Sequence, residues 1–149
     1  MTAKQNDPLL VTFFTEIGII NQLVTTRLER ALPDGLRLSH FSVLNHFVRL
    51  GGIRSPAQLA GAFQVTKGAM TNTLQKLDAK GLIRIRTNPE DGRGKLVTIT
   101  EKGRRIRNKA VAAMVPLFAE FEKAFTHAAL KDALPFLQEI RIYLDEARN

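Results

Sequence analysis

A polar segment near the middle of the chain carries many hydrogen-bonding side chains and almost no negative charge. From Lys67 to Lys76 its polar residues are basic, small or neutral, and the first carboxylate after them belongs to Asp78. Lys, Thr, Asn and Gln in this combination can bind phosphate oxygens and the edges of bases. The alternative is an ordinary solvated surface, but such surfaces usually mix Glu with Lys. The segment therefore favours contact with nucleic acid.

The apolar residues of this segment recur at helical spacing, so we expect a helix over residues 67–80 that ends at Gly81. The residues predicted to pack inward are Ala69, Leu74 and Leu77, with Met70 or Thr73 beside them. The residues predicted to point outward are Lys67, Gly68, Thr71, Asn72, Gln75 and Lys76.

A second polar cluster lies in the turn-rich stretch NPEDGRGK, which ends at Lys95. Residues 82–86 and 96–100 on either side of it alternate between apolar and polar, which predicts a β-hairpin. Arg93 is predicted to lie at its tip, where it can enter a narrow minor groove, whose negative potential attracts arginine. Asp91 is expected to hold Arg93 through a charge-assisted hydrogen bond. An ordinary polar hairpin is the alternative.

The helix over residues 67–80 needs a partner that positions it. Ser55 precedes Pro56 and is predicted to cap a short helix over residues 56–62, and Thr66 is predicted to cap the next one. Two capped helices joined by a few residues form a helix-turn-helix, and the hairpin that follows is the wing of a winged helix-turn-helix.

Longer helices are predicted on both sides of this region. Asp7 is expected to cap a nearly all-apolar helix that ends at about residue 31, and Ser39 a second helix that ends at Gly51. Thr100 is expected to cap a long helix, and a last apolar helix follows it. Pro116 and Pro135 predict a kink or a break within these two helices. The nine Phe residues are expected mainly in the core.

Composition supports a polyanion as partner. The 149-residue chain has a formal net charge of +8, with seven Lys/Arg against three Asp/Glu in residues 64–95 and five against one in residues 101–110. The basic residues of 101–110 are expected to lie against either a phosphate backbone or solvent; they are Lys102, Arg104, Arg105, Arg107 and Lys109. The chain has no Cys, which excludes disulfides and thiolate metal sites. No apolar run approaches the roughly 20 residues that span a bilayer, and the start MTAKQNDP has no signal-like apolar stretch, so we expect a cytoplasmic protein without membrane contact.

The ordered motifs resemble the multiple-antibiotic-resistance regulator (MarR) family of winged-helix transcription factors. The resemblance rests on VTKGAMTNTLQKLDAKGLI, the wing tip Asp91-Gly92-Arg93, the following strand, and Thr100-Glu101-Lys102-Gly103 at the start of the next helix. Gly92 departs from the pattern, because many members carry a second Arg there.

The resemblance implies a mainly α, α+β winged helix-turn-helix fold with about six helices and a two-stranded wing. One MarR-type domain would cover residues 1–149. Residues 1–35 and 101–149 would form a helical dimerisation region, and residues 36–100 the DNA-binding lobe.

The function expected from residues and resemblance together is that of a bacterial regulator that binds double-stranded DNA sequence-specifically. The resemblance implies a homodimeric repressor on a palindromic operator, relieved by a small aromatic or anionic effector that binds between the dimerisation and DNA-binding regions; no effector residue is indicated. A non-specific architectural DNA-binding protein and a winged-helix protein-interaction module remain as alternatives.

The predicted DNA contacts fall into three groups. We expect contacts with base edges from Lys67, Thr71 and Asn72, with Gly68 in the same DNA-facing set. Phosphates are assigned to Ser55, Thr66, Gln75, Lys76 and Arg84. The wing contributes Asp91, Arg93 and Lys95.

Catalytic and metal-binding chemistry finds no support. The three His residues, His40, His46 and His127, lack metal-site spacing and are expected in capping turns, on the surface or in packing. The chain carries no phosphate-binding loop or nucleophile elbow. We therefore expect neither an enzyme nor a cofactor.

Overall fold

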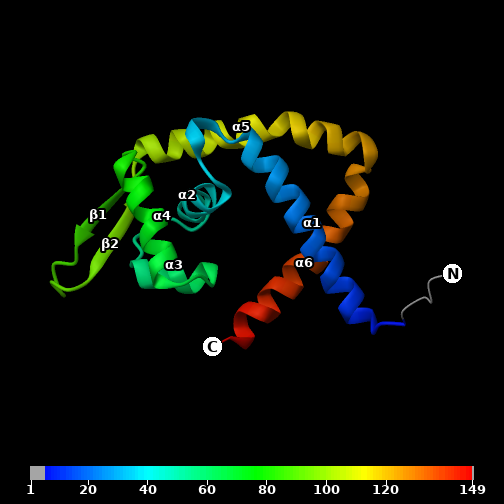
Figure 1. Ribbon diagram of the computed structural model, residues 1–149, viewed down its shortest axis with the longest axis horizontal. Coiled ribbons are helices and arrows are strands. Elements are labelled where there is room, and N and C mark those ends of the chain that lie inside the picture. The colour runs from blue at the N-terminus through cyan, green and yellow to red at the C-terminus, as the bar shows by residue number, and fades with distance from the viewer. Residues whose placement is uncertain (1–5, 149) are drawn as a thin grey trace. The chain divides into compact units, whose positions relative to one another are not determined.

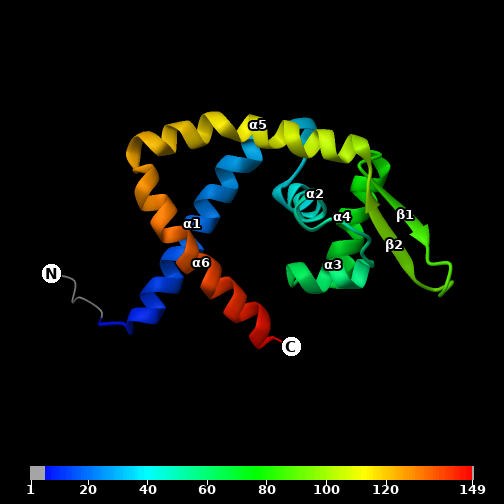
Figure 2. The same ribbon diagram turned by 180° about the vertical axis from the view of Figure 1, so that it is seen from behind.

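The computed structural model describes residues 6–148, which form the predicted helices and wing (Figure 1; from behind in Figure 2). The elements are α1 (Leu9–Ala31), a 3₁₀ turn η1 (Pro33–Gly35), α2 (Leu38–Leu50), α3 (Pro56–Phe63), α4 (Lys67–Ala79), β1 (Ile83–Thr87), β2 (Lys95–Ile99), α5 (Glu101–Ala124) and α6 (His127–Ala147). They confirm the mainly α winged helix-turn-helix class. The chain divides into two compact units, one up to Ala113 and one from Met114.

The core of the first unit joins α2, α3, α4 and the wing to the first half of α5. Its largest fully buried side chains come from every one of these elements except α5, which contributes Ala110. The fully buried large residues are Phe47, Leu44, Leu59, Leu74, Leu77, Ile83, Val43 and Val97. Because one apolar cluster holds all these elements, α4 and the wing share a single base.

The wing is an antiparallel hairpin whose register runs from Ile83 opposite Ile99 to Thr87 opposite Lys95. The predicted alternation is confirmed, since Ile83 and Val97 are buried while Arg84 and Arg86 are exposed. An isolated β-bridge joins a third backbone segment to the hairpin, which the sequence did not predict. Arg54 exchanges two backbone hydrogen bonds with Val97, at 3.1 and 2.7 Å, and so ties the loop before α3 to the wing.

A tight junction connects α4, β1 and the start of α5. The Thr100 hydroxyl accepts the backbone N–H of Gly103 (3.0 Å), as predicted for the cap, and donates to the carbonyl oxygen of Gly81 (2.7 Å). The backbone N–H of Thr100 donates to the carbonyl oxygen of Leu82 (3.1 Å). Gly103 is required at this point, because a Cβ there would overlap that same Leu82 carbonyl oxygen.

The predicted helix starts are partly correct. Ser55 and Thr66 accept the backbone N–H groups of Gln58 and Ala69, so both predicted caps are confirmed. Asp7 is not the cap of α1, whose flanking residue is Pro8 and which has no side-chain cap.

The predicted Ser39 cap is also wrong. Helix α2 begins two residues earlier than predicted, at Leu38, with Arg37 in the cap position. The Nδ1 atom of His40 accepts the backbone N–H of Arg37 at 2.9 Å, which places His40 in a capping turn. Its imidazole supplies the acceptor at the helix position where Glu or Gln does so in a capping box.

The long helices leave most of their apolar residues exposed. No residue of α1 or α6 is buried within residues 9–31 and 127–147. Of the nine Phe residues only Phe47 is buried, so the expectation that they form the core is wrong. Phe13, Phe41 and Phe63 are half-buried, and the other five are exposed within the described residues. Neither Pro116 nor Pro135 interrupts its helix, so the predicted break does not occur.

Helix α1 is long and apolar enough to cross a membrane by length and composition, with a mean hydropathy of 1.4 over an 18-residue window. The expectation that no segment meets this criterion is therefore wrong. The same property suits a helix whose apolar residues pack against another protein surface.

We predict that Gly103→Ala lowers the free energy of unfolding by about 3 kcal/mol, because the new methyl group must displace the Leu82 backbone. Urea denaturation followed by circular dichroism measures the change. Gly68→Ala is the matched control, since a Cβ at that exposed helical position meets nothing within 4 Å. Equal stability of the two variants would show that the junction tolerates a side chain.

A second prediction concerns pH. Burial lowers the pKa of His40, and the charges of Lys76, Lys80 and Arg37 lower it further, against a smaller opposing effect of Glu29. The unfolded chain then binds more protons than the folded chain below pH about 6.5. We therefore expect the free energy of unfolding to fall on this account as the pH is lowered from neutral through about 6.5.

The control for this measurement is His40→Gln, which offers an acceptor to the same backbone N–H but does not titrate. Its unfolding free energy should depend less on pH than that of the wild type. The same dependence in both proteins would contradict the role given to His40.

Candidate nucleic-acid interface

Helix α4 separates into a buried and an exposed face. Met70, Leu74 and Leu77 are buried, whereas Ala69 is exposed, contrary to prediction. The inward stripe is centred on Met70, and a residue one step earlier is rotated by about 100° away from it. The exposed residues include the whole predicted outward set, Lys67, Gly68, Thr71, Asn72, Gln75 and Lys76.

The beginnings of α3 and α4 add two hydroxyl groups. Thr66 is exposed and Ser55 is half-buried. Each side-chain oxygen accepts a backbone N–H of its own helix, at 3.1 Å in both cases. A hydroxyl can accept and donate at the same time, so each retains its hydrogen for a phosphate oxygen. The helix N-termini also favour anions through their aligned backbone dipoles.

The tip of the wing is held by side-chain and backbone hydrogen bonds. Asp91 accepts the backbone N–H of Arg93 at 3.1 Å, and Asn88 accepts that of Glu90 at 3.0 Å. The predicted bond between Asp91 and Arg93 is therefore present, at the main chain. Within the described residues the Arg93 guanidinium has no hydrogen bond or ion pair, so it is available to an external partner.

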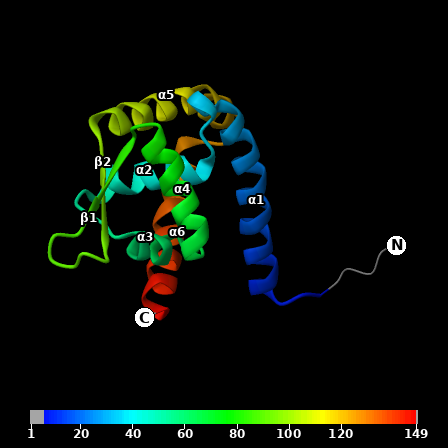
Figure 3. The same cartoon turned by 60° about the vertical axis from the view of Figure 1, so that its left-hand side comes forward.

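The wing tip and the beginning of α4 lie on the same side of the first unit. The two views in Figures 1 and 3 both place them away from the first half of α5. Arg84 and Lys95 are exposed on the strands between. The structure thus brings the beginning of α4 and the wing tip to one side of the first unit.

The structure adds two cations that the predicted set omitted. Arg86 is exposed on β1, two residues after Arg84. Because side chains along a strand alternate between its two faces, the position of Arg84 was enough to predict that Arg86 shares its face. Arg54 lies beside the middle of β2 through its bridge to Val97. No local pattern indicates that bridge, because the two strand segments are far apart in sequence.

The basic start of α5 is partly occupied within the protein. Lys102 donates to the carbonyl oxygen of Lys80 at 2.9 Å, where a cation offsets the negative end of α4. Arg107 donates two hydrogen bonds to Asn45 of α2, at 3.1 and 2.9 Å. Lys102 and Arg107 therefore stabilise the unit through hydrogen bonds within the protein. The two alternatives expected for this basic cluster, a phosphate backbone or solvent, did not include such internal partners.

This arrangement matches known DNA-binding regulators. Residues 34–94 match the model of the MarR family. The HTH-type transcriptional regulator YdgG of Bacillus subtilis (strain 168), itself uncharacterized, is 30% identical over 118 residues, which cover 75% of this chain and 72% of YdgG.

Solved structures agree along nearly the whole chain. The transcriptional regulator BldR from Sulfolobus solfataricus superposes with a TM-score of 0.79 at 26% identity, over 93% of this chain and 99% of BldR. A mutant MarR from E. coli complexed with operator DNA superposes with a TM-score of 0.72 at 26% identity, over 90% and 99% of the two chains. The family match over the lobe, extended by relatives that share both flanking helical segments, shows that this chain belongs to the MarR family of winged-helix transcriptional regulators.

Proposed function

We propose that the protein is a homodimeric repressor that binds a palindromic operator sequence-specifically and is relieved by a small-molecule effector. The observation that carries the DNA-binding part is the exposed polar surface of α4 from Lys67 to Lys76, which bears no carboxylate, together with a wing tip that lies on the same side of the unit as the start of α4 and carries Arg93. The operator complex of the E. coli relative supports it. A chromosomal target implies a cytoplasmic location.

Each cluster of the interface takes a distinct role in this proposal. Lys67, Thr71 and Asn72 contact base edges in the major groove, where Asn pairs with adenine through two hydrogen bonds. Arg93 enters the adjacent minor groove. The residues that fix the register on phosphates are Ser55, Thr66, Gln75, Lys76 and Arg84.

Dimerisation supplies a partner for the exposed apolar helices. We assign residues 1–35 and 101–149 to a dimerisation region and residues 36–100 to the DNA-binding lobe. The exposed apolar residues of α1 and α6 that favour this assignment include Leu10, Ile20, Leu23, Leu134, Leu137 and Leu144. A two-fold dimer would present two α4 helices about one DNA turn apart, roughly 34–36 Å.

Two other functions predict different behaviour. A non-specific architectural protein would bind operator and scrambled DNA equally, with a steep salt dependence. A protein-interaction module would bind DNA independently of Asn72 and Arg93. Tests of these alternatives need the operator sequence. Genomic footprinting of the purified protein on its own chromosome identifies it.

We predict that Asn72→Ala and Arg93→Ala each weaken operator binding by about 10- to 100-fold, because each removes a groove contact worth about 1–3 kcal/mol. Fluorescence anisotropy with the footprinted operator and its scramble measures both affinities. Asn72→Ala should also narrow the difference between the two DNAs.

The control is Lys131→Ala, which removes one exposed positive charge from α6 and should leave operator affinity nearly unchanged. Equal loss of affinity in Arg93→Ala and Lys131→Ala would indicate a net-charge effect and contradict the groove contact of Arg93, whereas unchanged affinity in Asn72→Ala, which removes no charge, would contradict the base contact of Asn72.

We also predict that Leu23→Lys or Leu137→Lys raises the dimer dissociation constant by at least about 100-fold, since each buries a charge in an apolar interface. Light scattering coupled to gel filtration measures the mass. Leu50→Lys replaces a comparably exposed leucine at the end of α2 and should remain dimeric. A wild-type monomer, or dimers for every variant, would refute the assigned interface.

A further inference from the structure

The wing tip contains an Asp-Gly pair, Asp91-Gly92, that is open to solvent. Both residues are exposed. Neither packing nor a positive φ requires glycine at this point, since a Cβ at Gly92 would meet nothing within 4 Å. Among the described residues, none accepts a hydrogen bond from the Gly92 backbone N–H. Because glycine has no side chain to shield it, this backbone nitrogen is accessible to the neighbouring carboxyl group.

The Asp91 carboxyl group is held beside that nitrogen. Its Oδ1 atom accepts the backbone N–H of Arg93 at 3.1 Å. The ring of atoms that this bond closes includes both the Asp91 carboxyl carbon, Cγ, and the Gly92 nitrogen. The Asp91 carbonyl oxygen also accepts the backbone N–H of Gly94, at 2.9 Å, which closes a tight turn over the same residues. The turn therefore folds the carboxyl group over the peptide bond between Asp91 and Gly92.

This arrangement permits a reaction that needs no other reactant than water. The Gly92 nitrogen bonds to Cγ of Asp91 and gives up its proton, while the protonated carboxyl group loses its hydroxyl oxygen as water. The product is a five-membered succinimide ring. Water then adds to one of the two ring carbonyl carbons. Opening at Cγ restores aspartate, whereas opening at the main-chain carbonyl breaks the original peptide bond and leaves isoaspartate, with the chain running through Cγ.

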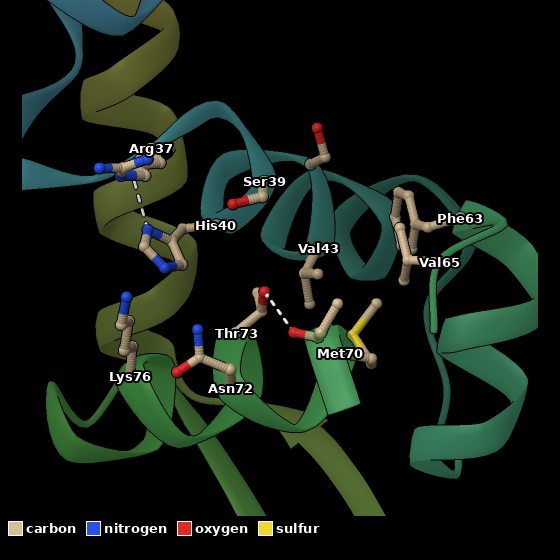
Figure 4. Close-up of a pocket in the computed structure, with 12 residues that line it drawn as sticks. Arg37, Ser39, His40, Val43, Phe63, Val65, Met70, Asn72, Thr73 and Lys76 are labelled. Atoms are coloured by element: carbon tan, nitrogen blue, oxygen red, sulfur yellow. Dashed lines mark hydrogen bonds between the residues drawn. The ribbon is translucent and has the colours of Figure 1, made fainter. Parts of the chain in front are cut away.

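The chain contains a second Asp-Gly pair, Asp34-Gly35, whose geometry prevents this reaction. Asp34 has a φ of 56° and a ψ of 30°, which turns the Gly35 nitrogen almost opposite to the Cβ atom of Asp34. Lys80 donates to the Asp34 carbonyl oxygen at 3.0 Å and stabilises that conformation. The turn leads into α2, whose start is fixed by the bond from the Arg37 backbone N–H to His40 (Figure 4). The carboxyl carbon of Asp34 therefore cannot reach the Gly35 nitrogen.

We propose that Asp91 is a site of spontaneous modification, at which ring closure onto the Gly92 nitrogen converts aspartate into isoaspartate in the folded protein. Asp34 has the same neighbour and remains aspartate, because its backbone is fixed in the wrong conformation. The core lies in other parts of the chain, so the modified protein keeps its fold and differs at the wing tip alone.

The consequence for DNA binding rests on the proposed function. In isoaspartate the oxygen that accepted the Gly94 N–H belongs to a free carboxylate, and Cβ becomes an additional main-chain atom. Both hydrogen bonds that order the tip, to Arg93 and to Gly94, therefore lose their geometry. The net charge is unchanged. Arg93 is displaced from the position in which it would enter the minor groove, so operator affinity falls without a loss of positive charge.

The first experiment follows the purified full-length protein, without DNA, during incubation at neutral pH and physiological temperature in water enriched in heavy oxygen. Peptide mass spectrometry with electron-transfer fragmentation distinguishes isoaspartate from aspartate at each position. Isoaspartate should accumulate at position 91 and carry heavy oxygen, because solvent water opens the ring. Position 34 should remain unlabelled aspartate.

Two variants test the chemistry of the ring closure. Gly92→Ala adds a methyl group for which there is space, so the fold is kept while the nitrogen is shielded. It should form isoaspartate several-fold more slowly than the wild type. Asp91→Asn keeps an acceptor for the Arg93 N–H and forms the same ring with loss of ammonia. It should reach the mixture of aspartate and isoaspartate faster, because a neutral amide carbon is attacked more readily than a carboxylate.

Three results would overturn the site. One is unlabelled aspartate at position 91 after an incubation in which a synthetic peptide of residues 88–95 isomerises. The second is isoaspartate at position 34 as fast as at position 91. The third is a wild-type rate in Gly92→Ala.

The second experiment measures DNA binding by the modified protein. The isoaspartate form, separated by chromatography from the unmodified form, should bind operator at least about 10-fold more weakly. Gly92→Ala should keep its operator affinity through the same incubation. Equal affinity of the two wild-type forms would refute the consequence for the wing. Failure of fresh wild-type protein to bind operator would refute the proposed function instead, and leave the modification at Asp91 standing.

Discussion

The close approach of the α5 backbone to the turn after α4 is the constraint on which the rest of the structure depends. At Gly103 the helix passes so near the Leu82 carbonyl oxygen that no side chain fits between them. Thr100 fixes the approach with both functions of its hydroxyl, one toward its own helix and one toward Gly81. Lys102 adds a bond to the last turn of α4. Helix α4, the wing and α5 therefore share one anchored point.

This junction explains how an exposed polar surface can keep a fixed geometry. Long Lys and Arg side chains lose conformational entropy when they bind, so their bases must be well positioned to bind specifically. The wing has only two strands and would be marginal alone. Its apolar side packs in the same core as α4, and Arg54 ties it down from a third direction. The tip is ordered locally by Asp91 and Asn88.

Local signals predicted much of this arrangement. The caps at Ser55 and Thr66 depend on neighbouring residues, and the alternation along the wing follows from strand geometry, so the sequence was sufficient for both. The errors have a common cause. Ala69 was assigned inward because a helical wheel does not fix the direction of the core, and the α2 cap was assigned to Ser39 because imidazole is an unusual acceptor there. The Arg54 bridge arises from packing between segments distant in sequence, which periodicity does not report.

The central claim is that α4 and the wing contact neighbouring grooves of one duplex. Hydroxyl-radical and dimethyl-sulfate footprinting of the wild type and Arg93→Ala on the same operator test it most directly, because the two reagents report minor-groove and major-groove access. We predict that the wild type protects both grooves in each half-site, and that Arg93→Ala loses only the minor-groove protection. Identical footprints for the two proteins, or protection of a single groove by the wild type, would contradict the account.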